Sequence, residues 1–118
     1  ITARNALEAL SAYEESHGPR ATLSSWQAFV KRHPTNAMGQ FALGNALYAD
    51  QQPDNARKAF ERATELDEKM GAAWLNLGLL LLQNDAPDAA REALTQAAAL
   101  EGSWQEKARL ALDSLNND

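Results

Sequence analysis

The chain has 118 residues, 45% of them hydrophobic, with a formal net charge of -5 at pH 7 and no cysteine. A chain of this length can bury one hydrophobic core, so we expect a single domain. The charge argues against nucleic-acid binding, because phosphate recognition needs a clustered basic face. The absence of cysteine excludes disulfides and thiolate metal sites.

Membrane insertion is not expected from the hydrophobic pattern. The longest apolar run, residues 77–82, is far shorter than the roughly 18 to 20 residues that a membrane span requires. The chain begins at Ile1 rather than at methionine, and we therefore expect a piece of a longer protein from which a targeting segment has been removed. A soluble protein is expected, and the cytoplasm and the periplasm both stay open as its location.

The first predicted elements are two helices within residues 1–36. Thr2 is the expected N-cap of a helix that runs to about Ser16, before the break at Gly18. A second helix is predicted over about residues 20–32, and Pro34 blocks its continuation. The cations at the end of this second helix are interpreted as solvated charges that complement the helix dipole, with a small anion-binding patch as the alternative.

Two further helix pairs and a last helix follow. The pairs are predicted over about residues 36–50 with 53–66, and 71–83 with 87–100. Pro53 and Pro87 begin the second helix of each pair, where a proline lacking its N–H does no harm. The last helix is expected over about residues 104–115, with Ser103 as its N-cap. One face of this helix is polar, as expected of a helix that caps the end of a stack.

The second and third helix pairs are copies of one another. Residues 37–66 and 71–100 align with a shift of 34 positions, and ten positions are identical. A fixed period of this length is typical of stacked helix pairs. The identical residues in the first copy are Leu43, Gly44, Leu47, Pro53, Asp54, Ala56, Arg57, Ala59, Ala63 and Leu66.

The third pair carries a recognisable motif, made of Trp74, Leu77, Gly78, Leu81, Ala90, Leu94 and Ala97. This spacing resembles the tetratricopeptide repeat, whose signature places Trp, Leu-Gly, Tyr, Ala and Phe at these positions. The resemblance implies an all-α protein, a right-handed α-solenoid of antiparallel helix pairs with seven helices. It also implies a protein that binds other proteins.

The resemblance divides residues 1–118 into repeats at 3–36, 37–70 and 71–102, followed by a capping helix at 103–116. The first repeat is degenerate, because Leu10 occupies the glycine site and Phe29 occupies a small-residue site. Small residues at these sites let two helices approach closely. A glycine inside a helix costs roughly 1 kcal/mol relative to alanine, so Gly44 and Gly78 indicate close packing.

In members of this family the first helix of each pair lines a concave groove, and the resemblance assigns groove positions by register. Large apolar residues exceed what the core of these helices needs, so part of them is expected to form an exposed patch that binds a partner. Asn45 and Asn76 are expected to hydrogen-bond a peptide backbone. The expected groove residues are Met38, Phe41, Asn45, Tyr48, Leu75, Asn76, Leu79, Leu82 and Gln83.

The expected ligand is a protein or peptide with an apolar helix or extended segment. Some family members hold a carboxylate with Lys and Arg, but residues 37–50 and 71–84 contain neither. Three alternatives remain open. In the first, a neighbouring helix covers the apolar residues. In the second, the apolar residues form the contact of a homodimer. In the third, the chain is an accessory domain of a larger bacterial enzyme or secretion component.

Catalytic activity is not expected from the residues present. His17 and His33 show no paired metal spacing, and Ser24 and Ser25 have no nearby base in the sequence. No glycine-rich phosphate loop is found. We therefore expect neither an enzyme nor a cofactor or metal.

Overall fold

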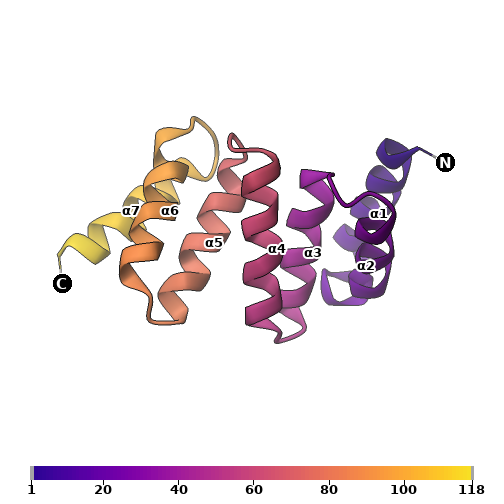
Figure 1. Ribbon diagram of the computed structural model, residues 1–118, viewed down its shortest axis with the longest axis horizontal. Coiled ribbons are helices and arrows are strands. Elements are labelled where there is room, and N and C mark those ends of the chain that lie inside the picture. The colour runs from indigo at the N-terminus through magenta and orange to yellow at the C-terminus, as the bar shows by residue number, and fades with distance from the viewer. Residues whose placement is uncertain (1, 118) are drawn as a thin grey trace. The chain divides into compact units, whose positions relative to one another are not determined.

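The computed structural model describes residues 2–117, which form seven α-helices and one short 3-10 turn and contain no strand (Figure 1). The all-α prediction is confirmed, and the helices over 53–66 and 71–83 have the predicted bounds. Within the described part no helix is both long and apolar enough to cross a membrane. The elements are α1 (Ala3–His17), η1 (Arg20–Thr22), α2 (Leu23–Arg32), α3 (Ala37–Ala49), α4 (Pro53–Leu66), α5 (Gly71–Gln83), α6 (Pro87–Ala99) and α7 (Gln105–Asn116).

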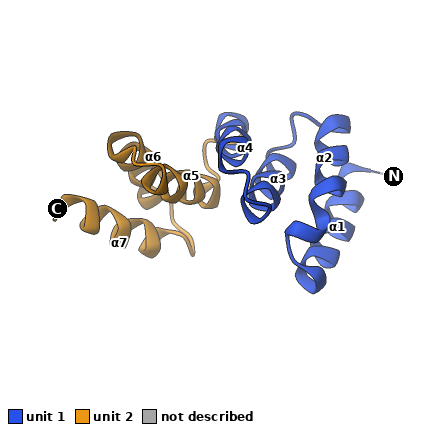
Figure 2. Ribbon diagram, turned by 90° about the horizontal axis from the view of Figure 1, so that it is seen from below, with its two compact units in different colours: residues 1–66 blue, residues 67–118 orange. Residues whose placement is uncertain are grey.

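The chain divides into two compact units, residues 1–66 and 67–118 (Figure 2). The first unit contains α1 to α4 and the second contains α5 to α7. The division falls directly after α4, four residues before the predicted start of the third repeat at residue 71. Each unit has a hydrophobic cluster of its own.

In the first unit, α3 and α4 pack closely because Gly44 has no side chain. A Cβ atom at Gly44 would lie 2.5 Å from Cε1 of Phe60, so the Phe60 ring lies directly on the α3 backbone. The N-terminus of α3 is capped by Asn36, whose Oδ1 accepts a hydrogen bond of 2.9 Å from the Gly39 N–H. The role predicted for Gly44 is therefore confirmed.

Helices α1 and α2 contact each other less than α3 and α4 do, and they form the repeat that is degenerate in sequence. No residue of α1 is fully buried, although Thr2 caps this helix as predicted. Phe29 of α2 instead packs on Gly39 of α3, where a Cβ atom would lie 2.6 Å from its ring. The core of the unit contains Trp26, Phe29, Ala42 and Ala46.

In the second unit, α5 packs against α6 through Gly78. A Cβ atom at Gly78 would lie 2.6 Å from Cγ of Leu94, a residue with no exposed surface. The indole of Trp104 lies against Gly71 and Gly102 and donates a hydrogen bond of 3.0 Å to the Leu100 carbonyl. This contact places the start of α7 beside α5.

The predicted cap of α7 is wrong. The helix begins at Gln105, its N-cap residue is Trp104, and no side chain caps it. Trp104 adopts a helical backbone conformation, and its indole fills the space that Gly71 and Gly102 leave. Packing of this indole, rather than a capping hydrogen bond from Ser103, therefore fixes the start of α7.

Helices α3 and α5 each end in a turn, and the two turns, 34 residues apart in sequence, have the same backbone conformation. Gln51 and Asp85 follow the ends of these helices with φ angles of 61° and 57°, in the left-handed region. In each turn the next N–H bonds back to the helix, Gln52 to the Leu47 carbonyl at 2.9 Å and Ala86 to the Leu81 carbonyl at 2.9 Å. The sequence repeat thus extends to the backbone.

Candidate functional site

The exposed apolar residues of α3 lie along one stripe of the helix. Met38 is 52% exposed and Tyr48 is 46% exposed, while Phe41 and Asn45 between them are partly buried. Steps of three and four residues join these positions, which places them on one face. The Phe41 ring also contacts Phe60, with centroids 6.0 Å apart. This stripe, called the α3 face below, combines two exposed large side chains with a partly anchored aromatic ring.

On α5 the predicted groove residues separate into two groups. Leu79 is 36% exposed, Gln83 is exposed and Asn76 is partly buried. Leu75 is only 7% exposed, so its predicted place in an exposed patch is wrong, and Leu82 is partly buried. The name α5 face is used below for Asn76, Leu79 and Gln83.

Helix α7 is the physical reason for the burial of Leu75. Leu75 packs in a cluster with Leu94 and with Ala108 of α7, and Leu82 packs against the same cluster. This is the covering by a neighbouring helix that the sequence left open as an alternative. Leu115 of α7 also lines a depression beside Leu82. The capping helix therefore uses two of the apolar residues that were expected to be free for a ligand.

The polar residues of the two faces are integrated into the protein. Asn45, Tyr48, Asn76 and Gln83 each take part in an interaction with the chain itself. A peptide backbone bonding to Asn45 or Asn76 would therefore compete with, or add to, an existing contact.

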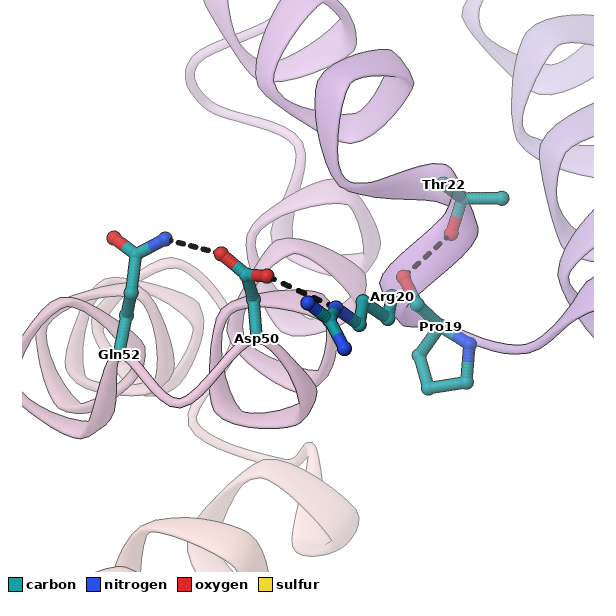
Figure 3. Close-up of polar contacts among 5 residues, drawn as sticks. All are labelled: Pro19, Arg20, Thr22, Asp50 and Gln52. Atoms are coloured by element: carbon teal, nitrogen blue, oxygen red, sulfur yellow. Dashed lines mark hydrogen bonds and ion pairs between the residues drawn. The ribbon is translucent and has the colours of Figure 1, made fainter.

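Two acidic side chains of the first unit, Asp50 and Glu14, have partners within that unit. The Arg20 Nε donates to Asp50 Oδ1 at 3.2 Å, and the Gln52 amide donates to Asp50 Oδ2 at 2.8 Å (Figure 3). The carboxylate of Asp50 thus connects η1 to the end of α3. It is not an unpaired negative charge.

Glu14 has a similarly structural position. The Trp26 indole N–H donates to Glu14 Oε2 at 2.6 Å, and the Thr22 hydroxyl lies 3.0 Å from the same oxygen. That hydroxyl also lies 2.9 Å from the Pro19 carbonyl (Figure 3), so it has two acceptors for one hydrogen. Glu14 therefore anchors the C-terminal half of α1 to α2.

We expect Arg20→Ala to change the free energy of unfolding by less than about 1 kcal/mol. The Arg20 side chain is 76% exposed, so water screens its ion pair with Asp50. Urea denaturation of both proteins measures the difference. The Arg4 and Glu8 pair, more exposed still, provides a control in the variant Arg4→Ala. A loss of several kcal/mol would show that the contact between η1 and α3 holds the first unit together.

Within residues 2–117 no group of three or more His, Cys, Asp or Glu side chains is arranged to hold a metal ion. The candidate sites are therefore the α3 face and the α5 face. Two features escaped the sequence analysis. They are the packing of Trp104 on Gly71 and a recess between α1 and α2. Trp104, the third tryptophan of the chain, was the only signal for the packing on Gly71, and the degenerate first repeat was the only signal for the recess.

Antiparallel helix pairs repeated every 34 residues, packed through glycine and carrying apolar faces on their first helices, define a helical repeat protein. A sequence profile of the tetratricopeptide repeat matches residues 41–108, more than half of the chain. The chain belongs to the tetratricopeptide repeat family. No curated protein sequence matches it significantly.

Solved structures of low sequence identity share this fold. The type III secretion translocator chaperone SycD of Yersinia enterocolitica is 16% identical, with a TM-score of 0.86 over 96% of this chain and 82% of that one. SycD in complex with a peptide of the translocator YopD has a TM-score of 0.84, at 16% identity over 96% and 91%. The first repeat domain of Spaghetti (RPAP3), bound to the HSP90 peptide SRMEEVD, has a TM-score of 0.83, at 14% identity over 98% and 90%.

Proposed function

We propose that this protein is a protein-interaction module that binds an apolar peptide segment through the first helices of its repeats. The observation that carries this proposal is the α3 face, where Met38 and Tyr48 are large, apolar and half exposed. Single exposed apolar residues are ordinary, but two on one stripe with Phe41 between them make a patch that a partner can bury. In the second unit, Leu79 on the α5 face is 36% exposed and offers an apolar contact of its own.

Two of the similar structures support a peptide as the ligand. SycD was solved with a peptide of YopD, and the Spaghetti domain with a peptide of HSP90. Their low identity to this chain leaves the nature of the peptide to be argued from the residues present. The proposed function is therefore binding, without a catalytic step.

The chemistry of the proposed site favours burial over ion pairing. Neither α3 nor α5 contains a lysine or arginine, so an anionic group has no cation to meet on these helices. Met38 and Tyr48 offer an adaptable thioether and an amphipathic ring, which suit apolar side chains of varied shape. The amides of Asn45, Asn76 and Gln83 can donate and accept, as a peptide backbone requires.

We expect the double variant Met38→Ser and Tyr48→Ser to bind the partner peptide at least about tenfold more weakly, because a buried aromatic at an interface often contributes 1 to 2 kcal/mol or more. Affinity selection of a random peptide library on the immobilised 118-residue protein supplies the peptide, and fluorescence anisotropy measures its affinity. Both side chains are half exposed, so circular dichroism should show an unchanged fold.

The matched control is Leu110→Ser on α7, because Leu110 is 61% exposed and lies in neither face. Equal weakening by the control, or unchanged affinity in the double variant, would contradict the proposal. Light scattering across a concentration series distinguishes the self-association alternative. A dimer that the double variant abolishes would assign the α3 face to a second copy of this chain.

A further inference from the structure

A recess of about 230 Å³ lies between the first two helices, within the first unit. It is smaller than the roughly 300–1,000 Å³ of typical small-molecule sites, and it has the scale of one or two side chains. Its walls are apolar, apart from a serine and a cationic edge. The lining residues are Ala6, Leu10, Ser25, Ala28, Phe29, Arg32 and His33.

The recess follows from the spacing of small residues along both helices. Ser25, Ala28 and Arg32 recur at three and four residues and lie along one stripe of α2, and Ala6 and Leu10 are one turn apart on α1. Leu10 stands at the position that Gly44 has in the second repeat, so α1 and α2 are held apart where α3 and α4 pack closely. The small side chains of α2 do not fill the space that results.

The charge at the edge of the recess is positive and unopposed. No Asp or Glu is among the lining residues. Within residues 2–117 the Arg32 guanidinium forms no ion pair or hydrogen bond. The His33 ring lies against Phe29, with centroids 4.8 Å apart, and joins the apolar wall to the cationic edge. The negative end of the α2 helix dipole explains why a cation such as Arg32 is favourable at this position. The dipole does not explain the apolar recess beside Arg32.

We propose that this recess is a second peptide-binding site, one that takes a large apolar side chain next to an aspartate or glutamate. The apolar side chain fills the space above Phe29 and Leu10. The neighbouring carboxylate pairs with the Arg32 guanidinium, whose planar array of donors matches a carboxylate. The site goes beyond the proposed α3 and α5 faces, because it lies between α1 and α2 and its recognition depends on charge.

The test uses the 118-residue protein and a synthetic decapeptide with a central Leu-Asp-Glu segment in a Gly/Ser background. In two-dimensional NMR we expect chemical-shift changes centred on Ala28, Phe29 and Arg32, with saturable binding. Replacing the acidic pair by Asn-Gln, or the leucine by serine, is expected to weaken binding at least fivefold. Arg32→Glu is expected to weaken binding tenfold or more.

Lys31→Glu provides the matched control. This substitution makes the same charge change one residue away, and Lys31 does not line the recess. Equal weakening by Lys31→Glu and Arg32→Glu would reduce the effect to general charge attraction and overturn the proposal. Ala28→Leu fills the recess from an exposed position and should reduce binding, whereas Gln27→Leu on the same helix should not. Shift changes on α3 with none on α1 and α2 would overturn the second site while leaving the proposed α3 face intact.

Discussion

Trp26→Ala is expected to lower the free energy of unfolding of the first unit by about 3 to 5 kcal/mol. Trp26 is 1% exposed, is the largest fully buried side chain, and makes an edge contact with the Phe29 ring at a centroid distance of 5.8 Å. Its removal leaves a cavity in the cluster. It also removes the hydrogen bond of 2.6 Å that the Trp26 indole N–H donates to Glu14. Urea denaturation followed by far-ultraviolet circular dichroism measures the loss.

Trp26→Phe separates the two contributions, because it keeps an aromatic ring and removes the donor. We expect a smaller loss than for alanine, since most of the apolar contact remains. Glu14→Gln tests the same hydrogen bond from the other side. A loss below about 1 kcal/mol for Trp26→Ala would mean that the cluster around Trp26 does not stabilise the first unit.

Leu94→Ala is expected to cost about 2 to 5 kcal/mol in the second unit. Leu94 has no exposed surface and fills the space above Gly78, within the cluster that also holds Leu75 and Ala108. Thermal denaturation should show a correspondingly lower midpoint. Thr95→Ala, at an exposed position of α6, should leave the midpoint nearly unchanged.

A double-mutant cycle with Gly78→Ala tests why Leu94→Ala lowers the free energy of unfolding. Alanine favours a helix by roughly 1 kcal/mol over glycine, yet its Cβ would lie 2.6 Å from Leu94 Cγ. We therefore expect Gly78→Ala to destabilise the natural protein and to become neutral or stabilising beside Leu94→Ala. Additive effects would show that Gly78 is not required for the approach of α6.

The helix pairs could be predicted because the relevant signals are local and repeated. Proline at the start of α4 and α6, and glycine at one register in α3 and α5, fix boundaries and close contacts without knowledge of the rest of the chain. The structure confirms Gly44 against Phe60 and Gly78 against Leu94. A period of 34 residues also identified the family from the sequence.

The exposure of individual groove residues was less predictable, because it depends on the following helix. The sequence places Leu75 on the inner face of α5 by register, but the packing of Ala108 on the same cluster buries it. The degenerate first repeat shows the same limit. Phe29 stands where a small residue was expected, and Gly39 of α3 accommodates its ring. Such an exchange of large and small residues between helices has no signature in either helix alone.

The α1 helix contributes no fully buried residue, yet both of its halves are attached. The N-terminal half packs Ala3, Ala6, Leu7 and Leu10 against the cluster around Trp26, and the C-terminal half is hydrogen-bonded through Glu14. Separation of the N-terminal turns of α1 from α2 would therefore expose apolar surface, because local opening is easiest only where few apolar contacts are lost. A side chain entering between α1 and α2 would meet two walls that are both held by the cluster around Trp26, which favours selection of shape over tolerance for size.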